Sequence, residues 1–487
     1  MEVPIQLILQ PSSTLARIAD HLDPAHRAQE SRPTFASVHG REAREVTAHD
    51  LALDHFMDRR LLTRPPTQAP QTTPDSTTPT TPPVPTTSTT PAHNVLLTGA
   101  TGYLGRFLAV EWLRRVAATG GRLTCLVRAA DDAAAHRRVL ECLRAAAADQ
   151  PDWFDDVAAQ HLTVLAADVS APRLGLAEPA WQTLAHQTDQ IVHAAALVNH
   201  ILPYHRLFTP NVTATAQLVE LALTHRVKRF AYVSTVAAAM LPDGSFLDET
   251  ADVRTACPVR RLDDSDANGY ATSKWAGEVL LRQAHEATGL PVTVLRPDMI
   301  LAHSRLPGQL NLTDRFTRLL LSVITTGMAP LSFYRLTPDG RRRRAHYSGL
   351  PVDFTAAAIT SLSADNTHDH LTYNTVNTHD DGISLDEFVD WLIDAGHPIT
   401  RFDDHRQWHQ RTEAALRGLP DHQRRLSLLP LMQAYTRPGE PRPGSAVPAA
   451  RFTAAVSRLG VGRGAVPSLS PEFVTKCVAD LKLHDLL

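Results

Sequence analysis

Three side chains near the middle of the chain have the types and the spacing to move a proton onto a substrate oxygen. Tyr270 and Lys274 are four residues apart in Y-A-T-S-K, and Thr235 follows Ser234 in the earlier stretch Y-V-S-T. Residues four apart on a helix project from one face. An ammonium beside a phenol lowers the phenol's pKa, so we expect Tyr270 to exchange a proton near neutral pH while Thr235 bonds the same oxygen. We therefore predict Thr235, Tyr270 and Lys274 as catalytic residues, although Y-x-x-x-K alone is also common as a surface pair.

A glycine-rich stretch upstream has the composition of a phosphate-binding turn. An apolar run over residues 95–98 leads into T-G-A-T-G-Y-L-G-R, where Gly99, Gly102 and Gly105 precede an amphipathic helix pattern that begins at Phe107. Glycine lets the backbone approach a pyrophosphate, and the N-terminus of the next helix offers N–H groups and a positive dipole. The spacing differs from the more usual G-x-G-x-x-G, and a plain tight turn is the alternative.

Residues that follow the next predicted strands fit the rest of a dinucleotide. Arg128 stands where NAD-dependent enzymes usually carry an acid that bonds the ribose hydroxyl. A guanidinium there, with Arg138 nearby, can hold a 2′-phosphate through two hydrogen bonds, which favours NADPH over NADH. We expect the adenine beside Asp168 and Val169. Small residues across which a nucleotide can lie follow the fourth predicted strand at Ala194, Ala195 and Ala196.

Alternating strands and helices must position these residues. Apolar runs typical of buried parallel strands cover residues 95–98, 123–127, 162–167, 190–194, 229–234 and 292–296. Helical patterns cover residues 213–225 and 270–287. Together they predict an α/β fold with a doubly wound, Rossmann-type parallel sheet, whose ligands bind at the carboxyl ends of the strands.

Longer stretches resemble a known family. The glycine turn, Y-V-S-T and Y-x-x-x-K resemble an extended short-chain dehydrogenase/reductase. Further motifs narrow the resemblance to the thioester reductase domain of carboxylic acid reductases: A-A-A-L-V-N-H-I-L-P-Y from Ala194, A-N-G-Y-A-T-S-K-W-A-G-E-V-L-L from Ala267, R-P-D-M-I-L-A from Arg296, G-Q-L-N from Gly308 and A-H-Y-S-G-L-P-V-D-F from Ala345. The stretch V-P-I-Q-L-I-L-Q-P-S-S-T-L-A-R-I-A-D-H-L, from Val3, is similar to the end of the carrier domain that precedes such a reductase.

The resemblance implies the reduction of an acyl thioester, held on a phosphopantetheine arm, to a free aldehyde with NADPH. It implies an acyl carrier domain as partner, normally upstream in the same polypeptide, and a small-molecule acyl substrate. The sequence has no carrier-type serine motif and no adenylation domain, so we expect the arm to be attached elsewhere. The cofactor contacts implied by position are Thr101, Gly102, Tyr103, Leu104, Arg128, Arg138, Asp168, Val169, Ala194, Ala195, Ala196, Ser234, Tyr270 and Lys274.

Two residues are candidates for substrate contact or gating. Asp298 follows the sixth predicted strand, where a carboxylate would face the nicotinamide pocket. It is a candidate sensor of the bound arm that stops reduction at the aldehyde, and an ordinary loop cap is the alternative. Asn199, beside His200, follows the fourth strand and is placed to touch the substrate.

We expect five parts. The resemblance implies that residues 1–22 are the end of a carrier domain; from the residues alone, the helix pattern there either docks on the main domain or is the last piece of a small helical bundle. Residues 23–63 are expected to form a connecting segment with a helix, for which Leu51, Leu53, Phe56 and Met57 are possible anchors. Residues 64–92 are almost entirely Pro, Thr, Ser and Gln, which predicts either a tether between moving parts or an unselected disordered insertion. Residues 93–300 form the NADPH-binding Rossmann domain. Residues 301–487 form a mainly helical substrate-binding region with some return to the sheet.

The C-terminal region is expected to supply an acyl pocket. Helices are predicted over residues 314–324, 385–395 and 416–435. Phe333, Tyr334 and the apolar run 319–324 either line a hydrophobic tunnel or pack in a core. The basic run 341–344 either meets the arm's phosphate or an acidic carrier surface, or is a solvated turn.

The composition argues against several other classes. With 48 Lys and Arg against 51 Asp and Glu, the net charge of −3 gives no basic footprint for nucleic acid. No apolar run approaches the roughly 20 residues of a membrane-spanning helix, and the first residues lack a secretory pattern. Four scattered cysteines without a C-x-x-C pair argue against a metal site and favour a reducing cytoplasm.

Two other functions share part of this pattern. A nucleotide-sugar epimerase or dehydratase would have the same sheet and Y-x-x-x-K, but should prefer an acid in place of Arg128. A redox-sensing NADPH binder would have no use for Thr235, Tyr270 and Lys274 together.

Overall fold

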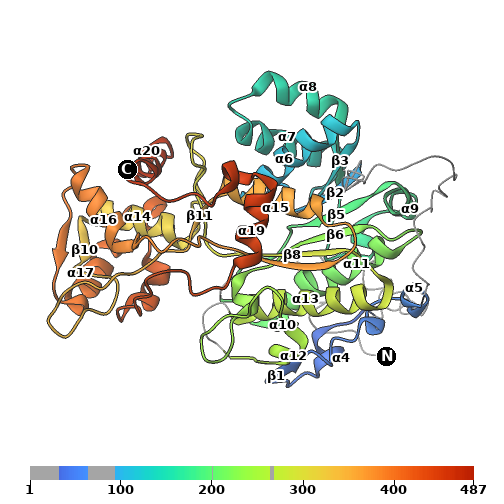
Figure 1. The fold of residues 1–487 in the computed structure, drawn as a ribbon. Coiled ribbons are helices and arrows are strands. Elements are labelled where there is room, and N and C mark those ends of the chain that lie inside the picture. Colours follow the sequence, from blue (N-terminus) through green and yellow to red (C-terminus); the bar gives the residue numbers. More distant parts are fainter. Residues whose placement is uncertain (1–31, 64–93, 200, 264–267) are drawn as a thin grey trace, which may run out of the picture.

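A seven-stranded sheet lies in the right-hand part of the molecule in Figure 1. The computed structural model describes residues 32–63, 94–199, 201–263 and 268–487. The strand order is β12-β8-β6-β5-β2-β3-β4, and every neighbouring pair is parallel. The strands are β2 (Asn94–Thr98), β3 (Arg122–Val127), β4 (Leu162–Ala166), β5 (Gln190–His193), β6 (Arg229–Val233), β8 (Val292–Pro297) and β12 (His370–Thr375). The predicted doubly wound fold is thus confirmed, with β12 as an edge strand that was not predicted.

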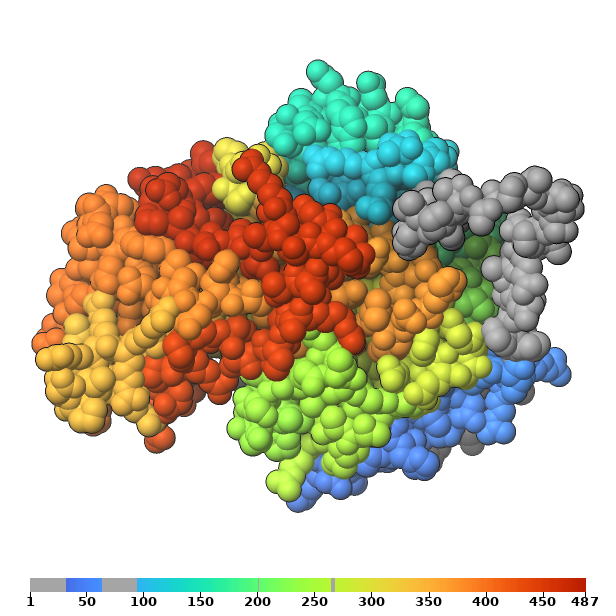
Figure 2. All heavy atoms as spheres, in the orientation of Figure 1, coloured from blue at the N-terminus to red at the C-terminus, as the bar shows by residue number. Residues whose placement is uncertain are grey.

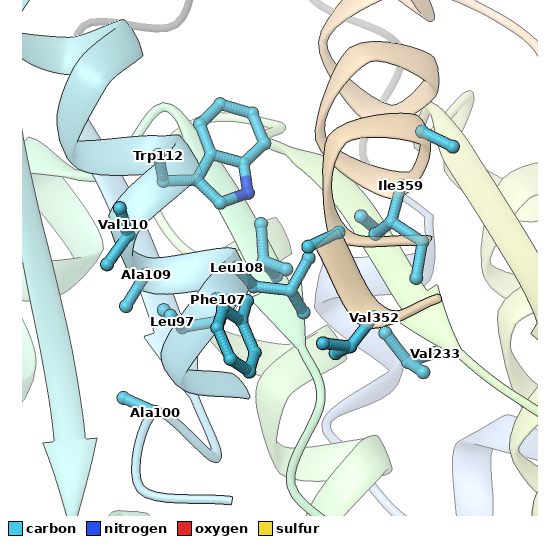
Figure 3. Packing of buried hydrophobic residues seen from close by; sticks show 14 of the residues in the cluster. Leu97, Ala100, Phe107, Leu108, Ala109, Val110, Trp112, Val233, Val352 and Ile359 are labelled. Carbon is cyan, nitrogen blue, oxygen red and sulfur yellow. The ribbon is translucent and has the colours of Figure 1, made fainter. Parts of the chain in front are cut away.

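Helices pack on both faces of this sheet, and the side chains of β2 show how. Val95 and Leu97 point into one hydrophobic core, and Leu96 points into the other. The first core is covered by α6 (Tyr103–Thr119), α7 (Asp132–Ala146), α8 (Pro151–His161) and α15 (Val352–Asp365). The second is covered by α9 (Glu178–Gln187), the π-helix η3 (Phe208–Thr213), α11 (Ala214–Leu223) and α13 (Asn268–Thr288). In Figure 3, Leu108 of α6 and Val352 and Ile359 of α15 point toward one another in the first core.

The chain before the predicted linker packs on the second face. Its elements are α4 (Phe35–His39), β1 (Glu45–Thr47), η1 (Leu53–His55) and α5 (Arg59–Leu62). β1 pairs antiparallel with β7 (Val259–Arg261), and Leu51, Leu53 and Met57 are buried in the second core, with Phe56 packed against it. The predicted carrier-domain end (1–22), residues 23–31, the linker (64–92) and His200 lie outside the described residues.

A separate helical lobe forms the left side of Figure 1 around a third core. Its elements are α14 (Arg315–Thr326), β10 (Met328–Pro330), α16 (Leu385–Asp394), β13 (Thr400–Phe402), α17 (His405–Arg417), α18 (Asp421–Leu426), the 3-10 helix η5 (Leu429–Tyr435) and α20 (Pro471–Leu483). The helices predicted over 314–324 and 385–395 match α14 and α16. The longer helical region predicted over 416–435 is divided into short pieces: α17 ends before Gly418, Pro420 precedes α18, and η5 forms a further short turn.

Two C-terminal segments return to the sheet. One comprises β11 (Leu350–Pro351), which pairs with β9 (Ile300–Leu301), followed by α15 and β12. The other comprises α19 (Ala450–Leu459) and the 3-10 turn η6 (Val461–Gly464), and lies across the junction of the two parts in red in Figure 2. Glu249 accepts hydrogen bonds from the Arg451 and Phe452 nitrogens at the start of α19, at 2.6 and 3.0 Å.

Candidate functional site

The glycine turn joins β2 to α6 and is shaped by close backbone packing. Gly99 has a φ of +83°, and a Cβ there would lie 2.7 Å from the Ala195 nitrogen. A Cβ on Gly105 would lie 1.8 Å from the Gly99 oxygen, whereas one on Gly102, the N-cap of α6, would meet only that oxygen, at 3.3 Å. The backbone of the turn is therefore closely packed at Gly99 and Gly105, whereas Gly102 is accessible. Gly102 lies beside the free N–H groups of the first turn of α6, so a pyrophosphate fits the turn.

Thr101, Tyr103 and Leu104 lie half-buried around this turn. The Tyr103 hydroxyl donates to the carbonyl oxygens of Leu301 and Gln309, at 2.9 and 3.1 Å. The Tyr103 side chain thus ties the start of α6 to the C-terminal region, which the sequence did not reveal.

The predicted adenosine contacts lie together at one edge of the sheet. Because β2, β3 and β4 are parallel neighbours, their carboxyl ends place Arg128 and Asp168 beside the glycine turn. Arg128 is exposed, and Arg138 Nη1 donates to its carbonyl oxygen at 3.0 Å. Asp168 Oδ1 accepts a hydrogen bond from the Ser170 nitrogen at 2.9 Å and so shapes the loop after β4.

A residue upstream of the linker reaches the same edge. Arg32 Nη1 donates to the Ser170 oxygen at 2.9 Å, and its Nη2 donates to Gln217 Oε1. Gln217 Nε2 in turn donates to the Val169 oxygen at 3.2 Å. The segment before the linker therefore supports the loop on which the adenine is predicted to lie.

The small residues after β5 lie across the glycine turn. Ala194, Ala195 and Ala196 are half-buried, and the Ala195 nitrogen donates to Thr98 Oγ1 at 3.2 Å. Thr98 Oγ1 also bonds His193 Nδ1 at 2.8 Å. This buried pair fixes the backbone across which a nucleotide would lie.

The candidate catalytic residues come from the end of β6 and the first turns of α13. Ser234 is buried, and Thr235 is half-buried and caps the 3-10 turn η4 (Val236–Ala239). η4 packs against α13, which carries the half-buried Tyr270 and, one turn later, Lys274, whose side chain is buried. The structure thus brings the four predicted residues to one junction between β6 and α13.

The electrostatics of this junction differ from the sequence expectation. Burial raises the pKa of Tyr270 to about 12 instead of lowering it. Burial also lowers the pKa of Lys274 to about 7, against the opposing charge of Glu278. The expected acidic phenol is therefore not found, because burial disfavours the charged phenolate. A phenol with this pKa stays protonated at neutral pH and serves as a hydrogen-bond donor.

Glu278 anchors the junction from one helical turn beyond Lys274. It accepts hydrogen bonds from Ser234 Oγ at 2.5 Å and from Arg296 Nη2 at 2.6 Å, and all three side chains are buried. Arg296 Nη1 continues to Asn374 Oδ1 of β12 at 3.5 Å. Glu278 and Arg296 lie within two of the family motifs, but no role was predicted for either residue. The spacing Y-x-x-x-K-x-x-x-E, with three residues on one helix face, is the signal that identifies Glu278.

Comparisons with known proteins agree with this arrangement. The family model described as male sterility protein matches residues 97–359. A carboxylic acid reductase from Mycobacterium marinum is 46% identical over 492 residues, covering 100% of this chain and 40% of that protein. An isonitrile lipopeptide synthase from Mycobacterium tuberculosis is 44% identical over 498 residues, covering 100% of this chain and 19% of that protein.

A solved structure decides the assignment. The reductase domain of a nonribosomal peptide synthetase from Mycobacterium tuberculosis matches with a TM-score of 0.79 and 44% identity, over 91% of this chain and 100% of that one. The chain belongs to this family of reductase domains. The reductase domain has the NAD(P)-binding fold of the extended short-chain dehydrogenase/reductases, and it spans about 40% of the length of the carboxylic acid reductases it matches.

Asp298 lies where the sheet of the reductase domain meets the helical lobe. It follows β8, and its carboxylate accepts a hydrogen bond from Ser348 Oγ. Burial raises the pKa of Asp298, against the hydrogen bonds from Ser348 and the Met299 backbone. Ser348 belongs to the A-H-Y-S-G-L-P-V-D-F motif, and only folding shows that it meets Asp298.

The loop after β5 exposes several apolar side chains. Leu197, Val198 and Ile201 are 43%, 60% and 85% exposed. The Asn199 side-chain oxygen accepts hydrogen bonds from the Ile201 and Leu202 nitrogens, at 2.9 and 2.8 Å. Asn199 thus shapes the loop, and substrate contact by this residue stays a prediction.

The helical lobe of the reductase domain holds the other predicted features. Phe333 and most of the run 319–324 are buried in the third core, and Tyr334 packs against it. Of the two predictions for these residues, a tunnel lining or core packing, the structure shows core packing. Within the basic run, Arg342 Nη1 pairs with Asp390 Oδ2 at 2.5 Å, and Arg344 Nη2 pairs with Asp380 Oδ1 at 3.0 Å. The basic run is therefore partly neutralised by carboxylates.

No three His, Cys, Asp or Glu side chains gather closely enough to hold a metal ion, within the part of the chain that the structure describes. No helix among those residues is long and apolar enough to cross a membrane.

Proposed function

We propose that this reductase domain reduces a carrier-bound acyl thioester to a free aldehyde with NADPH. The observation that supports this most directly is the junction of β6 and α13, where Thr235, Tyr270 and Lys274 lie at the same carboxyl edge of the sheet as the glycine turn, with β5 between β6 and β2. The partner in this proposal is an acyl carrier domain with its phosphopantetheine arm. The four cysteines are free thiols, in keeping with a reducing cytoplasm.

NADPH, when bound, supplies the hydride. The glycine turn and the first turn of α6 hold the pyrophosphate, Arg128 and Arg138 hold the 2′-phosphate, and Lys274 holds the nicotinamide ribose. The adenine lies against the loop of Asp168 and Val169. Arg32 and Gln217 keep this loop in place.

Tyr270 and Thr235 act on the carbonyl oxygen of the thioester. With a pKa of about 12, the Tyr270 phenol is protonated at neutral pH and donates to that oxygen, while the Thr235 hydroxyl donates a second hydrogen bond. Both bonds strengthen as negative charge develops on the oxygen, so they stabilise the transition state more than the ground state. One hydride to carbon and one proton to oxygen give a hemithioacetal. Its C–S bond then breaks as the hydroxyl proton moves to sulfur, which leaves aldehyde and thiol.

Asp298 is proposed as the residue that couples reduction to the bound arm. Its bond to Ser348 joins the end of β8 to the segment that leads into β11 and α15. A substrate arm that rearranges this pair would assemble the nicotinamide pocket only for thioesters that carry a pantetheine-type arm. A free aldehyde would then be reduced slowly.

The test is a turnover assay with an N-acetylcysteamine thioester of a simple acid and NADPH. We expect NADPH oxidation, with aldehyde trapped as a hydrazone and identified by mass spectrometry, and loss of turnover in Tyr270→Phe. Tight NADPH binding without any turnover, by the wild type and by a version joined to a loaded carrier domain, would reject the proposal. Retention of bound NAD through purification would point instead to an epimerase-type enzyme.

A further inference from the structure

The aromatic ring of Tyr232 lies against the ammonium group of Lys274. Lys274 Nζ is 4.2 Å from the centroid of the Tyr232 ring. Tyr232 is fully buried on β6, and Lys274 is 2% exposed, so hardly any water separates or screens them. A cation is attracted to the face of an aromatic ring, and the attraction is stronger when both groups are desolvated.

Packing fixes the ring in this position. A Cβ on Gly277, three residues after Lys274, would lie 2.2 Å from Tyr232 Oη and 2.6 Å from Cζ, so only glycine leaves room for the phenol against α13. The His193 ring packs against Tyr232 with a centroid distance of 5.6 Å. The ring is therefore held between β5 and α13, and its face cannot turn away from Lys274.

The other titratable groups around Lys274 leave it short of counter-charge. Glu278 is the anion on its own helix, but its carboxylate already accepts hydrogen bonds from Arg296 and Ser234. On β5, His193 is fully buried near Lys274. Its burial and the charge of Lys274 hold the pKa of His193 well below its ordinary value, so the imidazole is neutral. Tyr270, on α13, is a neutral phenol at physiological pH because its pKa is about 12. None of these three groups offers Lys274 a free negative charge, so the face of the Tyr232 ring is a main group that stabilises the ammonium.

We propose that Tyr232 is a positioning residue whose ring face holds the Lys274 ammonium at the nicotinamide ribose subsite. This inference rests on the proposed function, because the role of Lys274 belongs to it. Tyr232 itself does not touch the substrate or the cofactor in this proposal. Its effect is to keep Lys274 charged and in place before NADPH binds.

Three substitutions at position 232 distinguish the effect of the ring's electron density from the effect of its shape. Tyr232→Leu removes the ring face, Tyr232→Phe keeps it, and a ring-fluorinated phenylalanine keeps the shape but withdraws electron density. In the leucine variant we expect the alkaline limb of the kcat/KM profile to move to lower pH by about one unit, since the neutral lysine becomes easier to form. The fluorinated variant should shift in the same direction relative to Tyr232→Phe, and Tyr232→Phe should keep the wild-type limb.

A second readout uses NADPH binding, followed by fluorescence across the same pH range. Affinity should fall above the alkaline limb, and at a fixed pH above it the leucine variant should bind NADPH about tenfold more weakly. Profiles of the fluorinated and phenylalanine variants that superimpose would overturn the inference, even if Tyr232→Leu does not fold. If the wild type binds NADPH but reduces no thioester, the proposed function fails while this titration still decides the role of Tyr232.

Discussion

Glu278 and Arg296 form a buried ion pair, with Oε2 and Nη2 2.6 Å apart and side chains only 3% and 1% exposed. The pair lies directly behind Ser234, which donates to the same carboxylate. It connects α13 to β8, and so connects the helix of Tyr270 and Lys274 to the strand that leads to Asp298.

Replacing Glu278 by Gln should destabilise the protein by about 3–5 kcal/mol, because it leaves the Arg296 cation buried without a counter-charge. Urea-induced unfolding measures the loss. Glu413→Gln is the matched control: Glu413 pairs with Arg417 at 2.5 Å on an exposed face of α17. This control should cost less than about 1 kcal/mol. Equal losses in the two variants would contradict the assignment of Glu278 as the anchor of the junction.

Lys274→Met should make the protein more stable at low pH while abolishing turnover. The folded pKa of Lys274 is about 7, below its unfolded value, so below pH 7 the folded wild type must keep a buried ammonium. Above pH 7 the folded lysine loses its proton before the unfolded one does. Wild type therefore gains stability relative to the variant by about 1.4 kcal/mol per pH unit.

Thermal unfolding of both proteins between pH 6 and pH 9 checks this dependence. The stability advantage of Lys274→Met should shrink steadily as the pH rises above 7. A difference that is constant with pH would show that Lys274 titrates normally in the folded protein.

Arg128→Ala should raise the KM for NADPH about tenfold or more and leave that for NADH unchanged, because a charge-assisted hydrogen bond to the 2′-phosphate contributes about 1.5–3 kcal/mol. Steady-state kinetics with the two cofactors measure both effects. Arg122→Ala removes an arginine from the opposite end of β3 and should change neither KM. Parallel changes for NADPH and NADH would place Arg128 away from the phosphate.

Asp298→Gly should increase the conversion of free aldehyde to alcohol by about tenfold, which corresponds to about 1.4 kcal/mol in the barrier. The variant no longer needs the arm to rearrange the Asp298–Ser348 pair. Product ratios from a supplied aldehyde, measured by gas chromatography, report the change. Ser348→Ala should act in the same direction but more weakly, and an unchanged ratio in Asp298→Gly would end the gating hypothesis.

Gly105→Ala should abolish NADPH binding and destabilise the domain by more than about 2 kcal/mol. The new methyl group would overlap the Gly99 oxygen, which lies 1.8 Å from the Cβ position, and overpacking against backbone is not relieved by side-chain motion. Calorimetric titration with NADPH and thermal unfolding test both effects. Gly439→Ala, whose Cβ would be 3.7 Å from the Phe333 oxygen, should leave both properties as in the wild type.

The sequence predicted the features that depend on short, local residue patterns. Six apolar runs gave six of the seven strands of the central sheet, and strand-end residues such as Arg128 and Asp168 follow because parallel strands share one carboxyl edge. β12 was missed, since H-L-T-Y-N-T has no continuous apolar run and becomes a strand only by pairing with β8.

Contacts between distant segments could not be predicted in this way. Ser348 meets Asp298, and Arg32 meets Ser170, only after the chain has folded back on itself. The direction of the Tyr270 pKa was wrong for a related reason. A four-residue spacing shows that an ammonium is near, but the extent of burial, which decides the sign, depends on the whole junction.

The hydrogen bonds of Glu249 to the start of α19 affect how parts can be exchanged between relatives. Glu249 accepts hydrogen bonds from the Asn374 nitrogen of β12 at 2.9 Å and from the first turn of α19, so it links a loop after β6 to two elements encoded far downstream. A chimera that takes residues 301–487 as one block would replace the edge strand β12 and the helices α15 and α19 that pack with the recipient's nucleotide-binding sheet. Recombination sites that leave both parts intact lie between residues 301 and 350, between 375 and 385, just before 450, and between 464 and 471. A graft made this way would transplant the helical lobe while the recipient kept its own α15, β12 and α19.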